Sequence, residues 1–188
     1  PLPGDGDTQI MVKWEAETGK IKISDVKTDP ITQTMVRNLL ENKRIDATVY
    51  DRMTDQASDI NKLALLSGLQ EYMSGEDLDK VRDSFTVSQV APHMININTA
   101  SADVLQSMGI SSDAVQLIIQ NRKEKVYTQQ DVTQDLISGI AGVKIPPATG
   151  NLVKNYLIAP APGDAQMIKV YSYATVGGYT KQVEAILN

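Results

Sequence analysis

Cysteine is absent from the 188-residue chain, and histidine, phenylalanine and tryptophan occur once each. Without cysteine the chain can form neither a disulfide nor a thiolate metal site, and it has no cysteine nucleophile. The lone histidine, His93, follows Pro92 and has no supporting serine and acid pattern, so we expect a loop or packing residue. The sequence therefore predicts no catalytic residue, no cofactor-binding residue and no enzyme activity.

Long apolar runs and an excess of basic charge are also missing. No run approaches the roughly 20 apolar residues that span a bilayer. The net charge is -5 and the 18 basic residues are scattered, which disfavours nucleic-acid binding because phosphate neutralisation supplies most of its affinity. The start PLPGDGDTQ is neither a signal peptide nor an initiator methionine, so we expect a further segment upstream of Pro1.

Alternating apolar residues mark both ends of the chain. Residues 9–15 and 19–24 alternate around the short turn AETG, and residues 167–176 and 179–187 alternate around Gly177-Gly178. Each pair predicts a β-hairpin, and neither hairpin is stable alone. We expect the two hairpins to pair into one small antiparallel sheet.

The middle of the chain has helical periodicity. Capping residues and apolar spacing predict helices from Pro30, with Asp29 as N-cap, and over residues 60–69, 74–82, 101–107, 112–122 and, more weakly, 130–140. Residues 50–59 look polar and irregular, and residues 85–90 look extended. The predicted fold class is α+β: a small antiparallel sheet built from both termini with a large helical, helix-hairpin-helix or SAM-like, insertion. The predicted domains are a pilin-like sheet part, 1–29 and 160–188, and a helical insertion, 30–159.

The stretch ININTAS, residues 95–101, changes from strand alternation to a helix start within seven residues. Thr99 or Ser101 can cap the helix through a hydroxyl group. An asparagine amide, which has both donor and acceptor, can tie the incoming backbone to the turn. We expect the isoleucines to enter the core and the asparagines to fix the direction in which the chain enters the helix.

The ordered pattern of ININTAS, LQSMGI (105–110) and AVQLIIQNR (114–122) resembles two families. One is the helix-hairpin-helix DNA-binding modules of competence proteins, and the other is protein K of the general secretion pathway, the large minor pseudopilin of type II secretion. The DNA-binding hairpin uses a second glycine so that backbone amides approach a phosphate. Here the turn is Gly109-Ile110-Ser111, and Asp113 follows where the phosphate would sit, so the charge disfavours DNA.

The resemblance to protein K covers nearly the whole chain. Residues 17–23 resemble that family's first strand, residues 60–69 its helix ending in Gly-Leu, and YSYATVGGYTKQVEAIL (171–187) its closing strand pair. This chain lacks the family's Trp-Asp-rich segment and Gly-Ala-Glu stretch, and has RIDATVYDRMTDQASD (44–59) in their place. A minor pilin of a type IV pilus is therefore kept as an alternative.

The resemblance implies a structural role. A K-like minor pseudopilin caps the tip of the type II secretion pseudopilus and helps to initiate its assembly in protein transport. Its implied partners are I- and J-like minor pseudopilins, the major pseudopilin and, through an upstream helix, the inner membrane, with no nucleic acid. The implied location is the periplasm, anchored in the inner membrane before assembly.

A calcium site is the weaker cofactor interpretation, because K-like pseudopilins can bind calcium in the helical insertion. The candidate ligands are Asp5 and Asp7 and, as a second set, Asp51, Asp55 and Asp59. The spacing of the second set fits a solvated helical face equally well, and the EF-hand pattern is missing. No metal ligands and no partner-binding residues are assigned from the sequence.

Overall fold

The computed structural model describes residues 9–55, 60, 63, 65–88, 93–136, 154–161, 168–176 and 179–187. The chain forms two compact units, each described here by itself. The sheet unit comprises Pro1–Glu17 and Ala165–Asn188, and the helical unit comprises Thr18–Asp164. Assignment of residues 1–29 and 160–188 to a pilin-like part stays a prediction.

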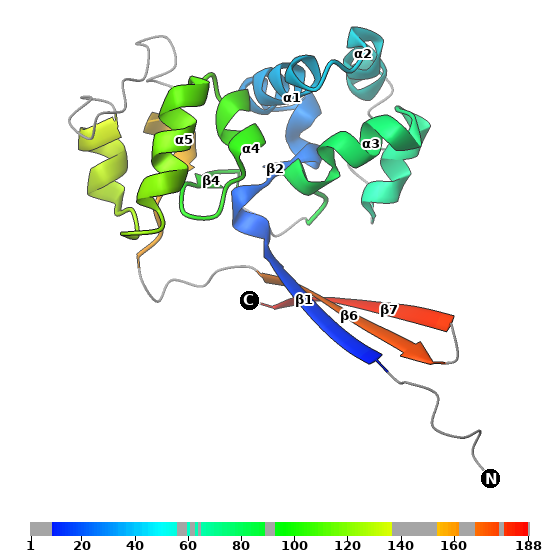
Figure 1. Ribbon diagram of the computed structural model, residues 1–188. Helices are drawn as coiled ribbons and strands as arrows, with labels where there is room; N and C mark the ends of the chain where they lie inside the picture. The colour runs from blue at the N-terminus through cyan, green and yellow to red at the C-terminus, as the bar shows by residue number, and fades with distance from the viewer. Residues whose placement is uncertain are drawn as a thin grey trace. The chain divides into compact units, whose positions relative to one another are not determined.

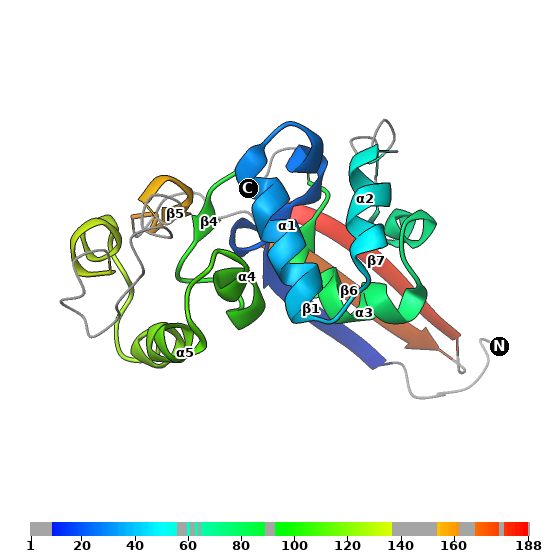
Figure 2. The ribbon, with the colours of Figure 1, turned by 90° about the horizontal axis from the view of Figure 1, so that it is seen from above.

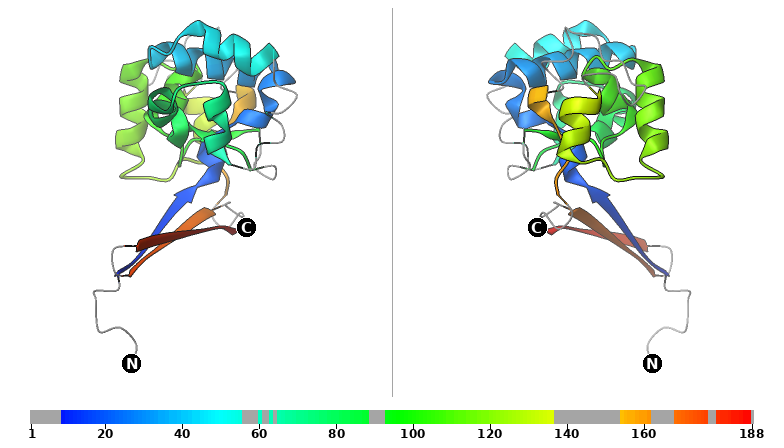
Figure 3. Two further views of the ribbon diagram at one scale, coloured as in Figure 1. Left: turned by 90° about the vertical axis from the view of Figure 1, so that its right-hand side faces the viewer. Right: turned by 90° about the vertical axis from the view of Figure 1, so that its left-hand side faces the viewer.

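The sheet unit is built from both ends of the sequence. Strand β1 (Gln9–Ala16) pairs antiparallel with β6 (Ile168–Val176), which pairs antiparallel with β7 (Tyr179–Leu187). The order is β1-β6-β7, and β6 lies between its neighbours in every view (Figures 1 and 3). The predicted antiparallel sheet from opposite ends is confirmed, as are the two strands flanking Gly177-Gly178.

The predicted N-terminal hairpin is wrong. Strand β2 (Ile21–Lys22) does not return along β1 but pairs parallel with β3 (Phe85–Thr86) in the helical unit. The reason lies in burial, because Ile21 and Ile23 are 1% and 0% exposed and belong to the core of that unit. The turn expected between the strands is a 3-10 segment, Glu17–Gly19, that leads the chain into that core.

The helical unit contains all the α-helices that the structure describes (Figure 2). They are α1 (Pro30–Asn42), α2 (Ala47–Asp55), α3 (Gly75–Val81), α4 (Ala102–Ser107) and α5 (Ser112–Asn121). Further turns are the 3-10 segments Ile23–Lys27, Leu66–Glu71 and Arg82–Ser84 and a π-helical segment, Asp131–Leu136. A parallel pair, β4 (Ile95–Asn96) with β5 (Leu157–Ile158), completes the unit.

Helix α1 begins and packs as its sequence predicts. The Asp29 carboxylate accepts hydrogen bonds from the Thr32 amide at 2.8 Å and from its hydroxyl at 2.6 Å, and Pro30 occupies the first helical position. Burial alone would raise the pKa of Asp29, but hydrogen bonds from Thr32 and from the Tyr156 hydroxyl outweigh it and lower the pKa. The apolar face of α1 is buried, and the helix contacts both α2 and α4 (Figure 2).

Helix α2 lies largely where the sequence was interpreted as irregular. Val49, Tyr50 and Met53 are buried at helical spacing, which places them on one face. Polar neighbours obscured this short apolar stripe. The predicted helices at residues 74–82, 101–107 and 112–122 are confirmed as α3, α4 and α5.

Two further helices were predicted in parts of the chain that the structure describes incompletely. Within 60–69 the structure describes Ile60 in a 3-10 turn, and a 3-10 segment runs from Leu66 to Glu71. Within 130–140 the π-helical segment ends at Leu136, and the remainder lies outside the described residues.

Gly19 marks a close approach between two segments of the helical unit. A Cβ built on Gly19 would lie 2.6 Å from the Ala100 nitrogen and 2.6 Å from the Thr99 carbonyl carbon. Both neighbours are main-chain atoms, which cannot move aside as a flexible side chain can. The glycine therefore allows the entrance to β2 to lie against the turn after β4.

We expect Gly19→Ala to lower the free energy of unfolding by about 1–3 kcal/mol, the usual range for overpacking. The matched control is Gly75→Ala in the first turn of α3, where the nearest contact of a Cβ is the Gln70 amide nitrogen at 3.8 Å. That control should be neutral or stabilising by up to about 1 kcal/mol. Urea unfolding followed by circular dichroism measures both, and equal stability of the two variants would contradict the close approach.

Candidate interaction surfaces

The ININTAS stretch forms a turn that is tied to distant main-chain atoms by its asparagines. The Asn98 side chain accepts a hydrogen bond from the Tyr127 amide at 2.9 Å and donates one to the Tyr127 carbonyl at 3.0 Å. Asn96 is fully buried, and its Oδ1 accepts from the Asn98 amide at 2.9 Å. The asparagines therefore fix the turn, as predicted, and Ile95 and Ile97 enter the core.

Arg122, at the end of α5, closes the same turn from the other side. One terminal nitrogen of its guanidinium donates to the carbonyl of Ile97 at 2.9 Å and to that of Ala100 at 2.8 Å. Burial lowers the pKa of Arg122 from its usual value, and the neighbouring Tyr127 partly offsets this effect. The sequence pattern contained Arg122 but did not reveal this role, because its partners are carbonyl groups 22 and 25 residues away.

The helix that follows the turn is capped by one of the two predicted hydroxyls. Ser101 accepts a hydrogen bond from the Val104 amide at 3.3 Å and is the N-cap of α4. Thr99 instead donates to the Asn96 carbonyl at 3.4 Å. After α4, Gly109 has φ 82°, a conformation that favours glycine, and Ser111 caps α5. The glycine thus serves the turn between the two helices.

The sheet unit presents one face of apolar side chains. Residues that oppose each other across neighbouring strands share a face, and the register joins Trp14 to Val170 and Val170 to Ala185 in one row across the sheet. The apolar sheet face, as defined by this register, comprises Ile10, Val12, Trp14, Ala16, Ile168, Val170, Ala174, Val183, Ala185 and Leu187, and it also carries Ser172 and Lys181.

This apolar sheet face is open to solvent in the structure. Trp14 is 69% exposed, Val12 61% and Val183 56%. Among the described residues, every buried hydrophobic side chain lies between Ile21 and Ala159, within the helical unit. The described part of the sheet unit thus has no apolar core of its own, and a contiguous exposed apolar face is typical of an interaction surface.

The opposite face of the sheet is more polar. It carries the Lys13–Glu15 ion pair at 2.5 Å and the stacked rings of Tyr171 and Tyr173, whose centroids are 6.4 Å apart. The two faces therefore differ in the partner that they can accept. The alternation of Ile10, Val12 and Trp14 along β1 was the sequence signal for this surface.

Residues 95–150 match the family model "Type II secretion system (T2SS), protein K". This segment of the chain is therefore similar to protein K of type II secretion. The matched region starts at the first residue of β4 and includes the asparagine turn, α4, α5 and Arg122. Comparisons with curated proteins and with solved structures gave no match.

This similarity supports a role in type II secretion. None of the helices within the described ranges is long and apolar enough to cross a membrane.

The residues considered for metal and acid–base chemistry lie apart. Asp51 and Asp55 are on α2, and Asp5, Asp7 and Asp59 lie outside the described residues. In the part of the chain that the structure describes, no three His, Cys, Asp or Glu side chains gather as metal ligands could. His93 lies in a bend with its Nδ1 2.5 Å from Asp25 Oδ2. Calcium binding stays a prediction.

We expect Asn98→Ala to lower the free energy of unfolding by about 2–3 kcal/mol, because it leaves a buried main-chain N–H and C=O without their side-chain partner. Asn42→Ala, at an exposed position near the end of α1, is the matched control and should change it by less than about 0.5 kcal/mol. Chemical unfolding with tyrosine and tryptophan fluorescence as the signal tests the pair. A loss no larger at Asn98 than at Asn42 would show that the turn does not depend on its amide.

Proposed function

We propose that this chain is the periplasmic part of a K-like minor pseudopilin that caps the tip of the type II secretion pseudopilus. In this role it is a structural protein rather than an enzyme. The observation that carries the proposal is the family match over residues 95–150. The sheet built from both ends of the sequence, with helices between them, is the arrangement that the resemblance implies.

The apolar sheet face supports a specific place for the rest of the protein. A sheet of three strands needs a covering element to bury its hydrophobic face. We propose that an apolar helix upstream of Pro1 packs on this face after anchoring the protein in the inner membrane. The same helix then joins the filament core with I- and J-like minor pseudopilins and the major pseudopilin.

The helical unit supports the tip position in this proposal. The described residues between β1 and β6 outnumber those in the three sheet strands, so the insertion is larger than the sheet that carries it. A wide head at the end of a filament leaves little room for another subunit above it. Assembly would then start from this cap and extend below it.

Labelling of filament ends tests the tip position. Full-length protein with an epitope at Gln116, an exposed position on α5, is expressed with overproduced major pseudopilin. We expect gold particles at single filament ends in electron micrographs, and labelled major pseudopilin, the control, should appear along the length. Labelling of the K-like subunit along the shaft would contradict a tip position.

A pair of substitutions on β1 tests the apolar sheet face. Val12 and Met11 are 61% and 64% exposed but lie on opposite faces. We expect Val12→Asp in the full-length protein to reduce secretion at least about 10-fold, because a buried unpaired carboxylate opposes helix packing. Met11→Asp should secrete normally. Secreted protein in the culture medium and co-purified I- and J-like subunits are the measurements, and equal effects of both changes would overturn the role of this face.

The DNA-binding and type IV pilus alternatives make different predictions. Duplex binding that weakens steeply with salt in a gel-shift titration would favour the helix-hairpin-helix alternative. Loss of surface pili with intact secretion in a deletion strain would favour a type IV minor pilin.

A further inference from the structure

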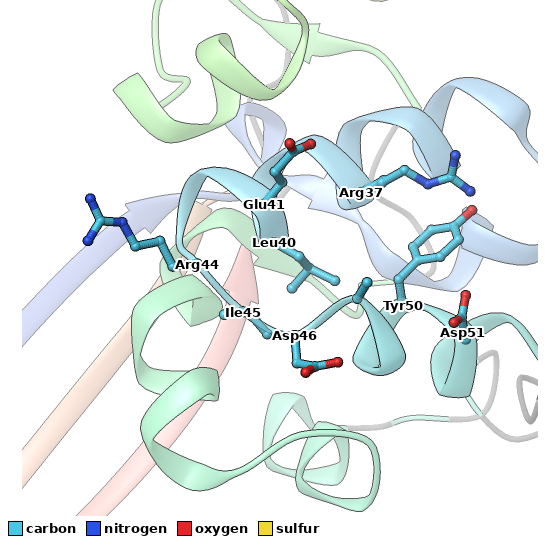
Figure 4. Close-up of a pocket in the computed structure, with 9 residues that line it drawn as sticks. Arg37, Leu40, Glu41, Arg44, Ile45, Asp46, Tyr50 and Asp51 are labelled. Carbon is cyan, nitrogen blue, oxygen red and sulfur yellow. The ribbon is translucent and has the colours of Figure 1, made fainter.

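A cavity of about 720 Å³ lies between the C-terminal half of α1 and the start of α2, within the helical unit (Figure 4). Its apolar lining includes Leu40, Ile45 and Tyr50, which are 2%, 6% and 8% exposed. Charged side chains, among them Arg37, line the cavity as well and are exposed. An apolar floor with a charged rim is the usual composition of a recognition site.

The Arg37 guanidinium is held in position by Tyr50. Its central carbon lies 4.6 Å from the centroid of the Tyr50 ring, and Figure 4 shows the two side chains side by side at one end of the cavity. Stacking fixes the guanidinium plane and leaves its N–H edges available. Within the described part of the chain, Arg37 has no ion pair or hydrogen bond through these N–H groups. Such a group is preorganised to bind a carboxylate.

Carboxylates on the rim decide the class of ligand. Glu41, Asp46 and Asp51 also line the cavity, and Arg44 is its second basic residue. Figure 4 shows the Arg44 side chain directed away from Arg37 and Tyr50. Hydrogen bonds from the Thr48 hydroxyl and from the Thr48 amide, at 2.8 Å, lower the pKa of Asp46, a carboxylate that is ionised at neutral pH in any case. These negative charges repel a multiply charged anion such as phosphate. A polypeptide, in contrast, can present a single carboxylate to Arg37 and a cation to the rim.

We propose that this α1–α2 cavity is a docking site for a short extended segment of a partner protein. The segment places an acidic side chain at Arg37, an aliphatic or aromatic side chain against Leu40 and Ile45, and a basic side chain near Asp46. Tyrosine and arginine are the residues that most often dominate such interfaces. The inference goes beyond the capping role and does not depend on it.

Selection from random peptides displayed on phage tests this inference with the complete chain as bait. We expect the selected sequences to combine Asp or Glu with a neighbouring aliphatic or aromatic residue and a Lys or Arg. A synthetic peptide of the most frequent sequence is then titrated by fluorescence polarisation. Arg37→Gln should weaken its binding about 3- to 5-fold, since it removes the charge that pairs with the carboxylate at an exposed site.

Two further variants complete the design. Ala47→Trp fills the cavity from the exposed first residue of α2 without removing a core side chain, and it should also weaken binding at least about 10-fold. Arg52→Gln, on the same helix but outside the cavity lining, is the matched control and should bind as the unchanged chain does. Circular dichroism confirms that each variant is folded.

Several results would overturn the inference. Selection without enrichment of acidic residues, or no selected peptide at all, would do so. Unchanged affinity in both Arg37→Gln and Ala47→Trp would also refute it, as would equal loss in Arg52→Gln. Displacement of the peptide by inorganic phosphate at equal concentration would indicate a small-anion site in its place. None of these results bears on the labelling of filament ends, so failure of the two proposals can be distinguished.

Discussion

The helical unit depends on a small set of hydrogen bonds from side chains to main-chain atoms around the turn after β4. Asn98 holds both main-chain groups of Tyr127, and Arg122 holds the carbonyls of Ile97 and Ala100. These bonds join segments that are 22 to 29 residues apart. A buried main-chain group without a partner costs about 1–3 kcal/mol, so the turn and the helices that meet at it are stabilised together.

The same turn also requires a residue without a side chain at the segment that lies against it. The main chain at Thr99 and Ala100 lies so close to Gly19 that no side chain fits between them. The Ile97 amide also donates to the Ile158 carbonyl at 2.8 Å, which attaches the returning segment β5. The entrance to the helical unit and the segment near its exit therefore both lie against residues 95–100. This position explains how one short stretch can determine the fold of a much longer insertion.

Local signals in the sequence predicted the elements whose stabilising contacts are themselves local. These elements include the caps at Asp29 and Ser101, each bonded to a residue three positions on, and strands β6 and β7, which are consecutive in the sequence. The predictions that were wrong concern elements with distant partners or few local signals. Residues 19–24 alternate like a hairpin strand, but their partner is β3, more than sixty residues away, and no local pattern identifies it. Helix α2 was missed because only Val49, Tyr50 and Met53 mark its buried face.

The candidate surfaces also divide into features with local sequence signals and features that depend on distant contacts. The apolar sheet face could be read in part from the alternation of Ile10, Val12 and Trp14, since a strand alternates by geometry alone. The extent of this face could not be predicted from the sequence, because the rows across the sheet depend on the register of β1 with β6. Arg37 and Tyr50 are thirteen positions apart on different helices, so their stacking required the packing of α1 against α2. The sequence therefore indicated which side of an element is apolar, but not which residues of different elements contact each other.

The two surfaces differ in the kind of association that they can support. Full burial of a large apolar side chain contributes about 1.5–3 kcal/mol, and the apolar sheet face offers several such side chains, including Trp14 and Ile10. That sum favours a permanent partner, which the proposed place in a filament requires. The charges of the α1–α2 cavity are exposed, and an exposed ion pair contributes only about 0–1 kcal/mol. Contacts at the cavity are therefore weak and reversible, which suits a surface that meets its partner and releases it again.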